Sequence, residues 1–329
     1  MKRAYSEIIM KISKIKIFLI VLCTLSFSYI NTFAQAINRY NPDTMLTVVL
    51  DKDVIKTARA GLYVEDFINQ IIKDSSFYDA FKNMKKYAFT AENTVVTYDS
   101  NNKVKGKIYR KIRHLNDKKG HKMITLANIT SGELYKRNGN YKLYSVEMFD
   151  YIFTNAYNSD FSEPNSNSSL AKMGKNEGYK EKLKTLVFSP GKPIKGIPFI
   201  ASKTQIFDED MRKNYNYTFA SGTYLDSIPV YRFKVLMKTD ISDWTKDGIM
   251  IKELTTIFDK RNFQILGRYI DMKMDNIAFS FDVQMNIEMT YIKEILLPTK
   301  ISYQGNWDIP FKKEERASFL VLHKDYKLE

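Results

Sequence analysis

The sequence predicts a β-dominated α+β fold with one large antiparallel sheet, and the clearest evidence is the stretch from Ile277 to Tyr291. From Phe281 onward, apolar and polar residues alternate over eleven residues, as in a strand with one buried and one solvent-facing side. The residues expected on the buried side are Phe281, Val283, Met285, Ile287, Met289 and Tyr291. Those expected on the wet side are Asp282, Gln284, Asn286, Glu288 and Thr290. At ~3.3 Å per residue this strand is about twice the usual length, so a large sheet is expected around it.

Two amphipathic helices are the second observation. Apolar residues recur at three- and four-residue steps from Val64 to Met84, which predicts a helix with a bend near Ser75-Ser76. Ser145 is a suitable N-cap for a second helix over 146–157. Since the apolar residues of each segment share one face, both helices are expected to pack against the sheet.

Turn signals between apolar runs are the third observation. Asn138-Gly139 predicts a hairpin that joins 134–136 to 141–144, because both turn residues accept positive φ. From 215 to 326 the pattern is a meander with short loops, which favours antiparallel neighbours. Pro310 disfavours a central strand, so Trp307 is expected to cap the end of the core, with a pocket rim as the alternative.

Residues 1–34 have the features of a signal peptide. Basic residues precede an apolar run, 17–30, that is too short to cross a ~30 Å hydrocarbon core, and small residues follow it near Ala34. An uncleaved anchor is the alternative. The chain's one cysteine, Cys23, lies in this segment and follows Leu22, which does not suit lipidation. We therefore expect an exported protein, in the periplasm or on the periplasmic face of the outer membrane.

Residues 35–329 are expected to form a single domain, with a mobile loop near 158–178 that is rich in small and polar residues. The chain carries 51 Lys+Arg against 37 Asp+Glu. The lysines are spread along the strands, and together with export this argues against nucleic acid. A solvated surface with peripheral contact to anionic lipid head groups is the preferred explanation.

No constellation for catalysis, a metal or a cofactor can be assembled, so an enzyme is not predicted. The histidines His114, His121 and His323 lack the spacing of metal ligands. Asp243 and Asp247 match parts of a calcium loop, but its bidentate glutamate position holds an apolar residue. A hairpin turn at Asp247-Gly248 explains the same residues without metal.

The order of elements resembles the periplasmic lipoprotein-carrier (LolA-like) half-barrel family. The likeness is carried by Tyr217-Thr218-Phe219 with Gly222, by 231–235, by Ile257-Phe258-Asp259, and by Leu297-Pro298-Thr299-Lys300-Ile301 after the long strand. The resemblance implies a strongly curved antiparallel sheet, a half-open barrel, wrapped around the amphipathic helices. It also implies an apolar cavity that takes acyl chains. The chain is longer than a typical carrier, and no lipoprotein-contacting arginine can be transferred to it.

The expected function is therefore non-enzymatic binding of lipid or of an acylated protein in an apolar cavity. The alternative is a structural or interaction module of the outer membrane or periplasm whose core is fully packed. The residues expected to line the cavity are large, apolar and assigned to inner strand faces. They are Phe233, Val235, Met237, Phe281, Val283, Met285, Ile287 and Met289.

Overall fold

The structure is a computed structural model of the 329-residue chain. It describes residues 48–50, 62–117, 120–150, 153, 188–192, 203–275, 280–308 and 314–328. The chain divides into two compact units, Met1–Met45 and Leu46–Glu329, and every described residue belongs to the second. The predicted signal peptide (1–34) and the loop predicted near 158–178 lie outside the described residues.

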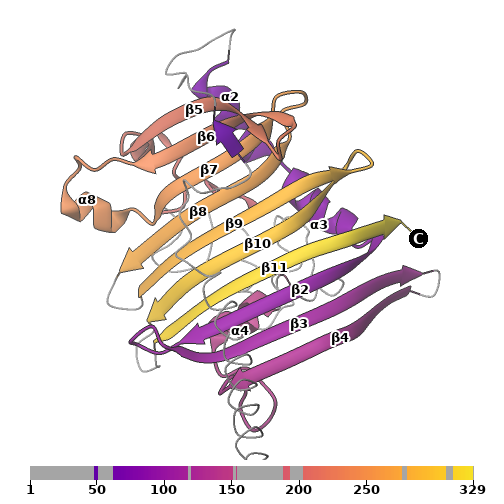
Figure 1. Cartoon of the computed structure of the whole chain (residues 1–329). Helices are drawn as coiled ribbons and strands as arrows, with labels where there is room; N and C mark the ends of the chain where they lie inside the picture. Colours follow the sequence, from indigo (N-terminus) through magenta and orange to yellow (C-terminus); the bar gives the residue numbers. More distant parts are fainter. Residues whose placement is uncertain are drawn as a thin grey trace, which may run out of the picture. The chain divides into compact units, whose positions relative to one another are not determined.

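The described strands form one antiparallel sheet (Figure 1), which confirms the β-dominated prediction. The strands are β1 (Val48–Leu50), β2 (Tyr87–Tyr98), β3 (Val104–Asp117), β4 (Gly120–Gly132), β5 (Tyr215–Tyr224), β6 (Ile228–Met237), β7 (Ile251–Asp259), β8 (Ile265–Asp275), β9 (Ser280–Ile292), β10 (Ile295–Asp308) and β11 (Glu315–Leu328). Their order is β1-β5-β6-β7-β8-β9-β10-β11-β2-β3-β4, so β1 and β4 are the two edges and the sheet is not closed. The predicted meander is present as β5 to β11, each strand pairing with the next.

The described helices are short: α2 (Val64–Lys73), α3 (Ser76–Met84), α4 (Tyr144–Phe149), α7 (Glu209–Arg212) and α8 (Asp243–Gly248). The predicted bend is a complete break between α2 and α3. Asp74 is in an extended conformation, and its Oδ1 accepts hydrogen bonds from the backbone N (3.2 Å) and Oγ (2.6 Å) of Ser76. These two bonds end one helix and start the next.

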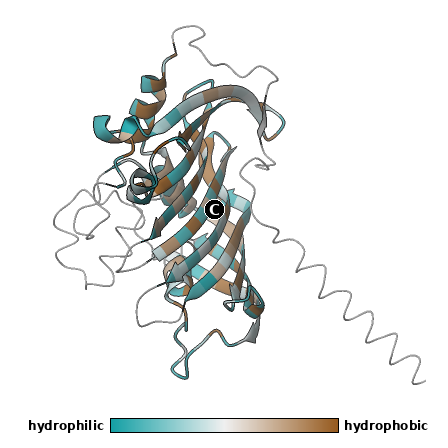
Figure 2. Ribbon diagram, turned by 90° about the vertical axis from the view of Figure 1, so that its left-hand side faces the viewer, coloured by the Kyte–Doolittle hydropathy of each residue, from teal (hydrophilic) through white to brown (hydrophobic). Residues whose placement is uncertain are grey.

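Helices α2, α3 and α4 pack against one face of the sheet, as Figure 1 shows. The ring of Phe67 in α2 stacks on Phe233 of β6, with centroids 4.9 Å apart. The ring of Phe149 in α4 stacks on Phe319 of β11 at 4.1 Å. We call this side the helix-covered face and the other the opposite face. Hydrophobic and hydrophilic residues alternate along the strands in Figure 2, as strands with two different faces require.

Strand β9 confirms the predicted apolar side from Phe281 to Met289, but Tyr291 is only half-buried and the wet side needs correction. The side chains from Phe281 to Met289 at odd positions are buried. On the opposite face, however, Asn286 is fully buried and Glu288 is 6% exposed. The amide of Asn286 donates to Glu288 Oε1 (2.7 Å), and the Lys300 ammonium lies 3.1 Å from the same oxygen. Polar side chains that hydrogen-bond to one another can be buried at the centre of a sheet, which alternation alone does not reveal.

Of two further local predictions, one is confirmed in a short form and one is wrong. The hairpin predicted around Asn138-Gly139 is present: Tyr135 and Tyr141 form an antiparallel bridge, and the backbone N of Lys142 donates to the O of Leu134 at 2.8 Å. The turn predicted at Asp247-Gly248 belongs to α8, whose first turn is capped by the hydroxyl of Ser242, which accepts from the backbone N of Thr245. A serine cap before an acidic residue is a helix start signal, and it outweighs the turn propensity of Asp-Gly here.

The predicted role of Ser145 is also corrected. Ser145 lies inside α4, and Leu143 is the N-cap residue. The capping oxygens come from Glu315 of β11, which accepts from the backbone N of Tyr144 and of Ser145, both at 2.8 Å. Trp307 lies at the end of β10, packs partly buried against the core and stacks on Phe281 at 4.9 Å, which agrees with a place at the end of the core. The strand that carries it is nevertheless a central one, with β9 and β11 on its two sides.

Candidate functional site

The residues predicted to line a cavity all lie on the helix-covered face, in two groups. Phe233, Val235 and Met237 are on β6, and the other five are on β9. The register connects the groups through β7 and β8. Phe233 lies opposite Thr256, which lies opposite Arg268, which lies opposite Ile287. The strands therefore bring the predicted residues to one face, but β7 and β8 separate the two groups.

The predicted residues are covered by the helix layer and by their neighbours. Seven of them are at most 7% exposed, and Met237 is partly buried against the core. At the β6 end, the Phe67 ring contacts Phe233, Phe219 (4.9 Å) and Phe258 (5.2 Å between centroids). At this end the Phe67 ring of α2 thus fills the face together with the rings of the sheet, and a ligand would have to replace it.

Arg268 lies at the centre of this face and was missed by the sequence analysis. It is 2% exposed. Its Nη1 donates to the backbone O of Phe188 (2.8 Å), and its guanidinium carbon lies 4.4 Å from the centroid of the Phe77 ring. Burial lowers the pKa of this guanidinium to about 10, while nearby Asp74 and Tyr78 act in the opposite direction. The side chain therefore remains a cation at neutral pH.

The period of β8 could have revealed this arginine. Ile270, Met272 and Met274 occupy alternate positions and are buried, and Arg268 continues their series on the same face. A cation in an apolar series is informative, because a buried charge is costly unless it is paired or used. It contacts α3 and the residue at 188 together, so it connects the sheet to the layer that covers it.

Within the described part of the chain, two cavities lie beside the helix layer. One of about 370 Å³ lies at the α2–α3 junction beside the β9–β10 turn and is lined mainly by polar side chains, among them Gln70, Lys73, Asp79, Asn83 and Gln264. The other holds about 10 Å³ between α4 and strands β2 and β3, where both side-chain polar atoms of Asn93 are buried without a hydrogen-bond partner. Neither cavity is lined by a predicted residue.

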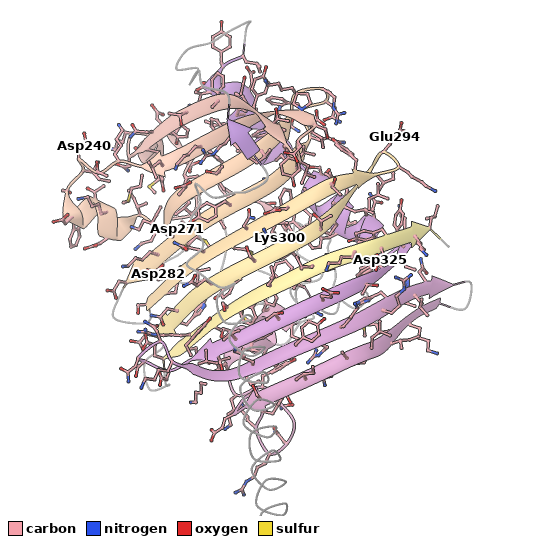
Figure 3. All side chains as sticks on the ribbon, in the orientation of Figure 1. Asp240, Asp271, Asp282, Glu294, Lys300 and Asp325 are labelled. Atoms are coloured by element: carbon pink, nitrogen blue, oxygen red, sulfur yellow. The ribbon has the colours of Figure 1, made fainter. Side chains whose placement is uncertain are left out.

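The opposite face is polar over β7 to β10. Asp271, Asp282 and Lys300 point toward the viewer from this face in Figure 3. Burial and neighbouring Asp282 raise the pKa of Asp271 to about 6. The described residues contain no group of three or more His, Asp, Glu or Cys side chains placed to hold a metal ion. Among the helices described, none is long and apolar enough to cross a membrane.

Comparison with known proteins adds little. No family model matches the sequence, and neither does any curated protein. Among solved structures, the crystal structure of a DUF1329 family protein from Desulfovibrio piger ATCC 29098 is 10% identical, with a TM-score of 0.25. That match covers 81% of this chain and 93% of the other. A likeness this low carries no argument, so the function must be argued from the residues.

Proposed function

We propose that this chain is a non-enzymatic cell-envelope protein that binds lipid, or the acyl chain of an acylated protein, between the helix-covered face and helices α2 and α3. In this proposal the sheet is the half-open barrel of the lipoprotein-carrier family, and the helices form its removable cover. The protein works in the periplasm or on the periplasmic side of the outer membrane.

The buried Arg268 is the observation that carries the proposal. An apolar side chain of similar volume would fill the same place without the cost of removing a charge from water. Arg268 instead places a cation amid apolar side chains, beside Phe77 and Phe188. An acyl ligand has an apolar chain and an acidic or polar head, and a cation within an apolar face matches both parts.

The cover is built so that its parts can move separately. Helices α2 and α3 are ten and nine residues long, and Asp74 interrupts the backbone between them. The Phe67 ring of α2 stacks on Phe233 of β6, and the Phe77 ring of α3 lies against the Arg268 guanidinium of β8. An acyl chain that replaces these rings buries methylenes worth ~0.8 kcal/mol each, against the cost of association and of exposing the rings.

A packed structural or interaction module is the second candidate, and the near-complete burial of the predicted lining residues favours it. One experiment separates the two. The protein is purified without detergent, extracted with organic solvent and examined for bound phospholipid or fatty acid by mass spectrometry. It is then titrated with a fluorescent fatty acid.

Three variants test whether the fatty acid binds at the proposed site. Phe67→Ala removes the ring that covers β6, so it should tighten fatty-acid binding, provided a melting curve shows that it folds. Leu236→Ala is the matched control. Leu236 is also on β6, but its side chain is 39% exposed and lies on the opposite face, away from the proposed ligand. Met285→Trp should crowd the site and weaken binding. If neither the wild type nor Phe67→Ala binds lipid, the packed module is the correct account.

A further inference from the structure

Strand β4 is an unusually exposed sheet edge. It is the last strand in the order and, among the described residues, pairs only with β3. Every residue from Gly120 to Gly132 is exposed except Ala127, which is intermediate. An edge strand presents a row of unpaired backbone N–H and C=O groups that a further strand can bind.

The side chains of β4 do not protect this edge. Four of them are large, apolar and exposed: Met123 (43%), Ile124 (38%), Leu126 (55%) and Ile129 (65%). The strand contains no acidic residue and no proline, and Lys122 is its one lysine. Protected edges usually carry charges or proline, so this strand has the composition of a pairing surface. We propose that β4 binds β4 of a second copy of this chain in an antiparallel, two-fold arrangement.

The bulge in β4 selects the register. Lys111 pairs with Ala127 and Ile112 with Thr125, so Leu126 is an extra residue and the side chains change faces there. When two copies of β4 pair along their whole length about a two-fold axis, each side chain must lie opposite a partner side chain on the same face of the sheet. This is possible on both sides of the bulge only if the bulges of the two copies lie opposite each other. The register that meets both conditions places Ile124 opposite the partner's Ile129.

This register is self-complementary. Both copies contribute an Ile124–Ile129 contact on the opposite face, and each Leu126 meets the partner's Ala127. Thr125 meets the partner's Asn128, and Lys122 meets the partner's Ser131. Since the two Lys122 side chains are about nine residues apart along the pair, at ~3.3 Å per residue, they do not repel each other. The most exposed apolar side chains of the edge are thereby covered without a like-charge contact.

The basic side chains of the neighbouring strand β3 make the salt dependence of binding differ between a second copy and an acidic foreign strand. Lys107, Lys111 and Arg113 of β3 lie on the opposite face beside β4. In the dimer the two β3 strands are three strand spacings apart, about 14 Å, which exceeds the ~8 Å Debye length at 0.15 M salt. Salt should therefore leave dimerisation unchanged or strengthen it, whereas an acidic foreign strand would bind more weakly as salt rises.

Cysteine cross-linking tests the register. Two single-cysteine variants of the full chain are expressed in a Cys23→Ser background. One is Ile124→Cys, and the other is Ile129→Cys with an added mass tag, so that the mixed disulfide can be told from the other products. Opposite residues in an antiparallel pair have Cα atoms about 4.5–5.5 Å apart, which a disulfide can span. Mixing the two chains under mild oxidation should give the mixed disulfide at least tenfold faster than Ile129→Cys mixed with Leu236→Cys. Leu236 is exposed on the same face but lies on β6.

Sedimentation of the chain with native β4 provides the second measurement. The dissociation constant of the dimer should rise at least tenfold in Ile124→Lys and should not rise between 0.05 and 0.5 M NaCl. A chain that stays monomeric at 100 µM, or a matched pair that cross-links no faster than the control pair, overturns the proposal. Dimers that dissociate as salt rises also contradict it and point to an ionic contact elsewhere.

Discussion

The guanidinium of Arg268 lies over the ring of Phe77, 4.4 Å from its centroid, so a strand of the sheet and a covering helix meet through a cation and an aromatic face. Such contacts contribute about 2 kcal/mol or more when desolvated. The same guanidinium donates to the backbone O of Phe188. The arginine therefore holds two parts of the cover on the sheet.

Replacing Arg268 should separate stability from binding. We expect Arg268→Met to change the free energy of unfolding little, because removing a buried charge from the core offsets the loss of both the hydrogen bond and the cation–π contact. Fatty-acid binding should weaken at least tenfold, since the cation that recognises the head group is gone. Urea denaturation and a fluorescent fatty-acid titration of the same preparation measure the two effects. Equal fatty-acid binding by the wild type and the variant would show that Arg268 is not part of the binding site.

Glu315 should contribute to stability through α4. Its carboxylate accepts from the backbone N of Tyr144 and of Ser145, so Glu315→Gln weakens two charge-assisted hydrogen bonds at a helix start. We expect a loss of about 1–3 kcal/mol in the free energy of unfolding. Glu133→Gln is the control, because Glu133 and its partner Lys142 form an exposed pair that contributes at most ~1 kcal/mol. Similar losses in the two variants would show that the cap is unimportant.

The two faces of β9 should differ in tolerance. Met285→Asp places an unpaired charge on the helix-covered face and should cost several kcal/mol, whereas Gln284→Lys on the opposite face should change stability by less than ~0.5 kcal/mol. Denaturant titration of both variants measures the difference. Equal effects would mean that the face assignment is wrong.

Acid should destabilise the protein through two buried histidines. Burial lowers the pKa of His114 to about 4, and burial together with His114 lowers the pKa of His323 to about 3. In the unfolded chain the histidine pKa values are near 6.5. Between pH 6.5 and the lower pKa values of the folded state, the unfolded chain therefore binds more protons than the folded protein. The free energy of unfolding should therefore fall as pH decreases through this range, by up to about 1.4 kcal/mol per pH unit for each histidine.

Urea titrations at several pH values measure this slope. His114→Phe should flatten it, because an uncharged ring can replace the imidazole that stacks on Phe89. A slope in His114→Phe as steep as that of the wild type would assign the acid sensitivity to other groups.

Asp271 should act in the opposite direction. Its raised pKa, about 6, means that the folded protein binds more protons than the unfolded chain between about pH 6 and 4. This group favours folding as pH falls and opposes it once ionised above pH 6. Asp271→Asn should therefore be more stable than the wild type at pH 7.5, and the difference should vanish near pH 4. Thermal melts at both values measure it; a variant less stable at pH 7.5 contradicts the cause assigned to the shift.

The sequence predicted the elements whose signals are local and periodic. Alternation located the apolar side of β9, and the three- and four-residue steps located α2 and α3. It could not predict Asn286 and Glu288 as buried, because their burial depends on a pair that includes Lys300 on the next strand. Nor could it predict the role of Glu315, which reaches a helix about 170 residues earlier in the chain.

The face that the predicted lining residues share could be predicted, because period two fixes the side to which a strand residue points. The sequence could not show how far helix side chains fill that face, since this depends on distances between elements. Phe67 was assigned to an apolar helix face, but its stacking on Phe233 follows from the packing of α2.

The most direct test of the account is hydrogen–deuterium exchange with and without a saturating twelve-carbon fatty acid. Phe67 of α2 covers Phe233 of β6 and Phe77 of α3 contacts Arg268, whereas β8 is an interior strand of the sheet. We predict saturable binding, faster exchange in 64–84 when the ligand is bound, and unchanged exchange in 265–275. Absence of saturable binding, or binding that leaves the exchange of 64–84 unchanged, would contradict the account.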